Sequence, residues 1–204
     1  MYSNPDMRPK NLEKEQAIRS AALQIIQQEG LENLSMQKLA KVANISPRTI
    51  YIKYRDKDDL LIKLFIDEVL GAYEAAVLEN FDEKMAFAEG VKTIWLNTFH
   101  YLKNNVQAFA LMQYGKSSPL LNKGFHERNI SEGDFFAPIH RFLQLHIKKG
   151  TIRNFPHAVL RALLFAPVFE LMKEYFDHKE RPVQIITEKV IVKCSDAVVK
   201  GMMK

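Results

Sequence analysis

Residues 35–59 have the sequence SMQKLAKVANISPRTIYIKYRDKDD, in which two short helical patterns are separated by a brief interruption. The first predicted helix, MQKLAKVA, follows Ser35, and the second, PRTIYIKY, follows Ser46. A serine before a helix accepts a hydrogen bond from the first turn, and proline is favoured at the first helical position. Asn44, between the two patterns, tolerates the left-handed backbone that a tight turn needs. The stretch therefore predicts a helix-turn-helix.

The positive charge of the chain is concentrated in the same stretch. Residues 35–55 contain five Lys or Arg and no Asp or Glu, so their charge of +5 equals the net charge of the whole protein. The two flanking parts are almost neutral, because residues 1–34 have a net charge of −1 and residues 56–204 a net charge of +1. A basic helix-turn-helix is what binding to a phosphate-lined groove requires, and we therefore predict that it binds double-stranded DNA. The five cations are Lys38, Lys41, Arg48, Lys53 and Arg55.

The composition excludes several other classes of protein. With 47% hydrophobic and 26% charged residues, the 204-residue chain resembles an ordinary soluble protein, and its single cysteine excludes an internal disulfide. No apolar stretch is long enough for a signal peptide or a membrane span, so we expect a cytoplasmic protein without a membrane partner. The six histidines form no metal-ligand pattern. No nucleotide-binding, nucleophile-elbow or zinc-protease motif occurs, so we expect neither an enzyme nor a cofactor.

The apolar spacing is helical almost throughout and predicts an all-α fold. We expect a polar arm at 1–10, a helix-turn-helix DNA-binding domain at 11–79 that includes a connecting helix at 57–79, and a helical ligand-binding and dimerisation domain at 80–204. An irregular segment is expected at 119–132, and Pro167 is expected to kink its helix. The other predicted helices cover 12–29, 36–43, 47–54, 83–104, 105–116, 133–149, 156–178 and 182–200.

The order A…G…S-x-x-x-L-A-x-x-A-N-I-S-x-x-T-I-Y-x-x-Y-x-x-K-x-x-L, from Ala22 to Leu60, resembles the TetR-type (tetracycline-repressor-like) transcriptional regulators. The T-I-Y-x-x-Y-x-x-K part makes the resemblance fairly specific, whereas the rest of the chain matches only in length and helical layout. The resemblance implies a homodimer on a palindromic operator, released when a small hydrophobic ligand binds the C-terminal domain. The alternative is a regulator of the same fold without such a ligand, controlled by a protein partner.

The resemblance also implies roles for individual residues. Tyr51, Tyr54 and Lys57 would contact phosphates, and Lys53 would add phosphate affinity. Arg48 stands where the family often has Gly or Ala, and a long Arg there would shift base preference towards guanine. The full set of expected DNA-binding residues is Ser35, Gln37, Lys38, Ser46, Pro47, Arg48, Thr49, Tyr51, Lys53, Tyr54 and Lys57.

Two further sets of residues are candidates in the C-terminal part. Its aromatic positions and their neighbours predict a ligand pocket, although each position also suits a packed core. The last two helices are apolar over a wide arc, which favours a dimer interface over the alternative of a monomeric core. The pocket set is Trp95, Phe99, Phe109, Met112, Gln113, Tyr114, Phe136, Phe142, Phe165 and Phe169. The interface set is Leu160, Leu164, Val168, Ile186, Val190, Cys194 and Val198.

Overall fold

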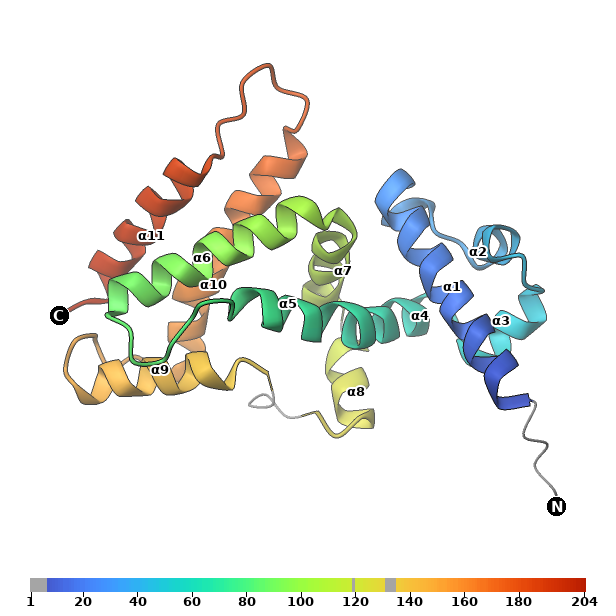
Figure 1. Ribbon diagram of the computed structural model, residues 1–204, viewed down its shortest axis with the longest axis horizontal. Helices are drawn as coiled ribbons and strands as arrows, with labels where there is room; N and C mark the ends of the chain where they lie inside the picture. The colour runs from blue at the N-terminus through green and yellow to red at the C-terminus, as the bar shows by residue number, and fades with distance from the viewer. Residues whose placement is uncertain (1–6, 119, 131–134) are drawn as a thin grey trace. The chain divides into compact units, whose positions relative to one another are not determined.

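The computed structural model describes residues 7–118, 120–130 and 135–204, and these are helical apart from short connections (Figure 1). No strand occurs among them beyond an isolated bridge between Ile152 and Met203, which confirms the all-α class. The helical elements are α1 (Met7–Glu29), η1 (Leu31–Asn33), α2 (Met36–Ala43), α3 (Pro47–Lys53), α4 (Lys57–Leu64), the π-helical η2 (Phe65–Leu70), α5 (Gly71–Val77), α6 (Phe87–Asn104), α7 (Val106–Ser117), α8 (Leu120–Glu127), α9 (Ala137–Lys148), α10 (His157–Asp177) and α11 (Glu188–Met202).

The chain packs into two compact units. Unit 1 consists of the residues up to Leu70 together with Val106–Ile130, and unit 2 consists of Gly71–Asn105 together with the chain after residue 130. This grouping differs from the single boundary after residue 79 that the sequence suggested. The reason is that α7 and α8 bring apolar side chains back against α4 and η2 of the N-terminal part.

The core of unit 1 forms where α1 packs on α2 and α2 packs on α3. The apolar stripe of α1 is buried as its spacing predicts, with Ile18, Ala22 and Ile25 at most 2% exposed. Leu39 of α2 and Ile50 of α3 are fully buried on the other side of this core. Burial of these side chains holds the two short helices of the helix-turn-helix, which are too short to be stable alone.

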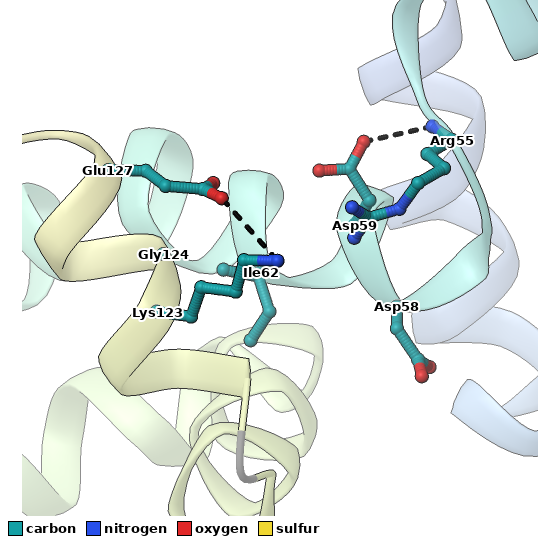
Figure 2. A pocket seen from close by; sticks show the side chains of 7 residues that line it. All are labelled: Arg55, Asp58, Asp59, Ile62, Lys123, Gly124 and Glu127. Carbon is teal, nitrogen blue, oxygen red and sulfur yellow. Dashed lines mark hydrogen bonds and ion pairs between the residues drawn. The ribbon is translucent and has the colours of Figure 1, made fainter.

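Helix α8 lies where the sequence predicted an irregular segment, and that prediction is wrong. It packs on α4 at Gly124, where an added Cβ would come within 2.5 Å of Ile62 Cγ2. The Phe125 and Phe65 rings are also in contact, with centroids 6.5 Å apart. A small cleft beside this contact is lined by Arg55, Asp58, Asp59, Ile62, Lys123, Gly124 and Glu127 (Figure 2).

In unit 2, helix α6 packs against α5, α10 and α11. Trp95 of α6 is fully buried, and its Nε1–H donates to the Leu164 carbonyl at 2.9 Å. Gly90 of α6 permits the Phe142 ring to approach, because an added Cβ would lie 2.5 Å from Phe142 Cζ. Pro167 lies inside α10, as the sequence predicted.

Several helix boundaries differ from those predicted. The helix expected at 57–79 is divided among α4, η2 and α5, and residues 7–10 of the expected arm belong to α1, while 1–6 lie outside the described residues. Helix α9 begins only after Phe136, whose φ of 58° interrupts the helical backbone. Helix α11 begins at Glu188 instead of residue 182. The Gln184 side chain accepts from Ile186 N and donates to the Tyr175 carbonyl, which holds the preceding segment in a non-helical turn.

Candidate nucleic-acid interface

The helix-turn-helix has the local geometry that its sequence predicts. Ser35 Oγ accepts from Lys38 N at 3.2 Å, and Ser46 Oγ accepts from Thr49 N at 3.3 Å, so both serines cap their helices. Asn44 ends α2 in the left-handed conformation, with φ 52° and ψ 43°. Pro47 occupies the first position of α3, where its missing N–H costs nothing. Local chemistry therefore fixes where α2 ends and α3 begins.

Helix α3 presents one face to the core and the other to solvent. Ile50 and Tyr54 are buried, whereas Arg48, Tyr51 and Ile52 are exposed, Ile52 by 76%. An exposed helix face that carries an arginine is able to enter a major groove and donate to guanine O6 and N7. The structure thus leaves Arg48 and Tyr51 available for the contacts expected of them.

Three of the five cations in residues 35–55 are neutralised by acids outside that stretch. In the part of the chain that the structure describes, Lys41 and Arg48 make no ion pair, and both are exposed. On α3, Arg48 is therefore exposed and carries a charge that no neighbouring carboxylate among the described residues offsets, whereas Lys53 is paired with Glu15. The ion pairs are Lys38–Glu29, Lys53 Nζ–Glu15 Oε2 at 2.9 Å and Arg55 Nε–Asp56 Oδ2 at 3.1 Å.

Tyr54 does not present its hydroxyl to a phosphate in this structure. The side chain is 3% exposed, and the hydroxyl oxygen is buried close to the Arg19 guanidinium. Burial raises the pKa of the Tyr54 hydroxyl, and Arg19 opposes that rise. The ring also lies under Lys63, whose Nζ is 5.4 Å from its centroid. The phosphate contact expected of Tyr54 does not fit this position, because the side chain faces the core of unit 1.

The start of α4 is built around two aspartates. Asp56 Oδ1 accepts from Asp59 N at 2.8 Å, and Asp59 Oδ2 accepts from Arg55 N at 2.9 Å. The hydrogen bond from Asp59 N lowers the pKa of the Asp56 carboxyl. Lys57 Nζ donates to the Leu31 carbonyl at 2.9 Å, and one such bond leaves two of its N–H groups to donate elsewhere. A phosphate contact by Lys57 stays a prediction.

Sequence inspection missed Ile52 and Val42 as candidate DNA contacts. Both are apolar and exposed, Ile52 by 76% and Val42 by 42%. Ile52 follows Arg48 by four residues, so the two share one face of α3. An apolar side chain on that face is suited to contact the thymine methyl group. The sequence does indicate Ile52: the buried positions 50 and 54 are four residues apart, and Ile52 lies between them on a different face of the helix.

The residues predicted to form a ligand pocket are divided between the two units. Unit 1 holds the four from α7, and Tyr114 there donates its hydroxyl to Asp58 Oδ1 at 2.7 Å. Unit 2 holds the remaining six. The two groups are Phe109, Met112, Gln113 and Tyr114 in unit 1, and Trp95, Phe99, Phe136, Phe142, Phe165 and Phe169 in unit 2.

Within unit 2 three of the predicted aromatic residues meet in one cluster. Phe136 contacts Tyr73 and Phe165, with ring centroids 5.5 and 5.9 Å apart, and Phe169 lies 6.1 Å from Tyr73. The buried Tyr73 hydroxyl forms a hydrogen bond of 3.2 Å with Thr98 Oγ1. Tyr73, Phe136, Phe165, Phe169 and Thr98 are hereafter called the Tyr73 cluster.

The other predicted pocket residues of unit 2 lie elsewhere. Phe142 stacks on Phe87 at 5.6 Å, and Trp95 is enclosed in the core. Phe99 lines an open groove of about 580 Å³ together with Lys103, Tyr175, Gln184, Ile186, Thr187, Glu188 and Lys189.

The predicted dimer interface needs correction on α10. Leu160, Leu164 and Val168 of α10 are fully buried within the single chain, and Ile186, in the segment before α11, is 5% exposed, so these four belong to its core. The wide apolar arc of α10 therefore has an inner part that packs on α6 and an outer part that remains exposed. The exposed part consists of Ala158, Val159, Ala162, Leu163 and Ala166, and on α11 Val190, Cys194 and Val198 are half-buried.

Among the residues that the structure describes, no helix is long and apolar enough to cross a membrane, and no three potential ligands gather around a metal-sized site. Two family models match the chain. Residues 18–64 match the model of bacterial regulatory proteins of the tetR family. Residues 87–199, more than half of the chain, match that of the tetracyclin repressor-like C-terminal domain.

The chain is also similar to individual regulators. An uncharacterized HTH-type transcriptional regulator of Haemophilus influenzae is 34% identical over 113 residues, which are 55% of this chain and 60% of that protein. The fatty acid metabolism regulator protein of Bacillus subtilis is 30% identical over 95 residues, 47% of this chain and 46% of that protein. The chain thus covers less than two thirds of either relative. The crystal structure of the transcriptional regulator FadR from Bacillus subtilis in complex with stearoyl-CoA has the same fold, with a TM-score of 0.66 and 21% identity, and the match covers 91% of this chain and 96% of that one.

Proposed function

The chain belongs to the tetR family of bacterial regulatory proteins, a family of DNA-binding transcriptional regulators, and on that premise we propose that it is a repressor released from its operator by a fatty acyl-CoA. The observation that carries the DNA-binding part of the proposal is the exposed face of α3. It displays Arg48, Tyr51 and Ile52 beside two serine-capped helix starts. This face has both the cation and the apolar surface that base recognition in a major groove needs.

The protein acts as a homodimer on a palindromic operator. Ala158, Val159, Ala162, Leu163 and Ala166 recur at helical spacing and form one exposed apolar face of α10. A second copy of the chain is the partner that suits this face, because an isologous contact pairs the face with itself. A palindromic operator then requires one α3 helix from each copy on successive major grooves, about 34–36 Å apart.

The effector is an acyl thioester with a long apolar chain. Two observations support this class of ligand: the related Bacillus subtilis protein is named a fatty acid metabolism regulator, and the FadR structure of the same fold contains stearoyl-CoA. In this chain, the Tyr73 cluster is the part of unit 2 that suits an acyl chain. Its members Phe136 and Phe165 are half-buried, so their rings are not fully enclosed by the fold.

A two-stage binding experiment tests the proposal. Genomic fragments captured by the purified protein are enriched first, and the strongest fragment is then labelled for fluorescence anisotropy. Stearoyl-CoA should weaken its binding about 5- to 150-fold, the usual range of coupling between two sites. CoA alone and stearate alone are the controls. Because coupling is reciprocal, the DNA fragment should weaken stearoyl-CoA binding by the same factor.

Each negative result has its own meaning. If no fragment is enriched over random DNA, the proposal of a sequence-specific regulator is wrong. If a fragment binds but stearoyl-CoA changes neither its affinity for the protein nor the melting temperature of the protein, the effector proposal is wrong. The second result would favour a regulator of the same fold that is controlled by a protein partner.

A further inference from the structure

The C-terminal end of α3 is held at three points inside unit 1. Lys53 Nζ binds Glu15 Oε2 of α1 at 2.9 Å, and the Lys53 carbonyl accepts from Lys63 Nζ of α4 at 3.2 Å. The adjacent Tyr54 is buried beside Arg19. The Lys53 side chain is 16% exposed, so it points away from the solvent-facing surface that carries Arg48. This position does not suit a cation that meets a phosphate.

The ion pair of Lys53 is the first of a connected series. Arg19 of α1 binds the other oxygen of Glu15 and reaches two acids of η2, one of which also binds Arg128 in the residues after α8. The series thus joins α3, α1, η2 and the end of α8 through side chains alone. Its contacts are Lys53–Glu15 at 2.9 Å, Glu15–Arg19 at 2.8 Å, Arg19–Glu68 at 2.5 Å, Arg19–Asp67 at 3.2 Å and Asp67–Arg128.

These pairs differ from ordinary surface ion pairs in their burial. The side chains in the series are between 16% and 34% exposed, whereas those of Arg55 and Asp56 are 62% and 52% exposed. Isolated surface pairs contribute little to stability, but members of a partly buried network depend on one another. Removal of one charge leaves its partner unpaired and poorly solvated, which is energetically costly. A shift of the neighbouring helix that exposes this partner to water would lower the cost.

We infer that this series positions α3 for DNA binding, with Lys53 as its positioning residue and Arg19 as its central link. The role rests on the proposed function, because it presumes that α3 enters a groove. Lys53 then contributes to affinity through the orientation of Arg48 and not by neutralising a phosphate. The effect of Arg128 on DNA binding would be exerted through Asp67, Arg19 and Glu15.

The test uses the full-length protein and the strongest captured DNA fragment. Lys53→Met, Glu15→Gln and Arg128→Gln should each weaken binding about threefold to tenfold, which lies within the range for residues in a coupling network. The Lys53→Met/Glu15→Gln double variant should bind no more weakly than the weaker single variant, because both substitutions break the same contact. Lys53→Arg should restore binding. Arg141→Gln, which breaks an exposed pair with Glu83 in unit 2, is the matched control and should have no effect.

The salt dependence separates positioning from phosphate contact. A lost phosphate contact lowers the slope of log K against log salt by about 1, whereas loss of a positioning residue leaves the slope unchanged. The inference is overturned if Lys53→Met lowers the slope in this way, or if Glu15→Gln tightens binding by releasing Lys53 to a phosphate. Urea unfolding confirms that each variant is folded at the binding temperature. If the wild-type protein binds no fragment, the proposed function is wrong. If the wild-type protein binds and the variants bind equally tightly, only the positioning role is wrong.

Discussion

Gly124 of α8 lies so close to Ile62 of α4 that an added Cβ would come within 2.5 Å of Ile62 Cγ2 (Figure 2). Ile62 is 5% exposed and has little space to move away. The two helices can therefore approach one another only because residue 124 has no side chain. This contact fixes α8 against the helix that begins with Lys57.

Gly124→Ala should destabilise the protein by about 1–3 kcal/mol, the usual cost of overpacking a core contact. Gly71→Ala is the control, because a Cβ there meets nothing within 4 Å and alanine is favoured in a helix. Urea unfolding should show a lower free energy of unfolding for Gly124→Ala, and one that is higher by up to about 1 kcal/mol for Gly71→Ala. Equal stability of the Gly124 variant and wild type would mean that α8 is free to move off α4.

Arg48→Ala should remove base discrimination at one position in each half-site, at a cost of about 1–3 kcal/mol there. The physical reason is that Arg48 is exposed on α3 and makes no ion pair with a described residue. Anisotropy measurements on a panel of single-base operator variants would detect the change. An equal loss on every sequence would identify Arg48 as a backbone contact.

Ile52→Ser should weaken operator binding about threefold to thirtyfold while changing the free energy of unfolding by no more than about 0.5 kcal/mol. The side chain is 76% exposed, so its removal from the fold costs little. Replacing thymine by uracil removes the methyl group, and that replacement should weaken wild type but not the variant. If the uracil operator binds wild type as tightly as the thymine operator, Ile52 has no methyl contact.

Asp56 should make the fold sensitive to acid. Its pKa lies below the ordinary value of 3.8 because Asp59 N donates to it, so the ionised form stabilises the fold. That stabilisation is complete above about pH 5 and is lost as the pH falls through the lowered pKa. Asp56→Asn keeps an acceptor at the cap without the charge, so its stability deficit at pH 7 should shrink as the pH falls below about 4 and vanish only below the lowered pKa of Asp56. A deficit that is constant over this range would show that the charge of Asp56 does not matter.

Leu163→Glu should prevent the proposed dimer from forming and abolish tight binding to the proposed operator. Leu163 is 36% exposed in the middle of the apolar face of α10, where a dimer would bury a glutamate without a partner. Sedimentation equilibrium would measure the change in mass, with Lys92→Glu on exposed α6 surface as the control. A variant that remains dimeric would place the interface on another surface.

Local structure around the DNA-binding helices was predictable because it depends on neighbours within four residues. Ser35, Asn44, Ser46 and Pro47 act on the backbone beside them, and each has the conformation that its sequence predicts. The buried stripe of α1 and the all-helical class follow from periodicity in the same way. The candidate DNA-binding face was found because most of its residues lie in one continuous stretch.

The partners of those residues could not be predicted in the same way, because they come from distant parts of the chain. Lys53 counts as a free cation in the sequence, yet it is 38 positions away from the glutamate that neutralises it. Tyr54 is buried and lies against Arg19 and Lys63, which belong to other helices. Helix α8 packs on α4 through Gly124 and Ile62, which are 62 positions apart. The sequence by itself determined the caps, the turn and the basic helix. Only the tertiary structure decided which charges remain available to DNA, since ion pairing and burial depend on proximity in space.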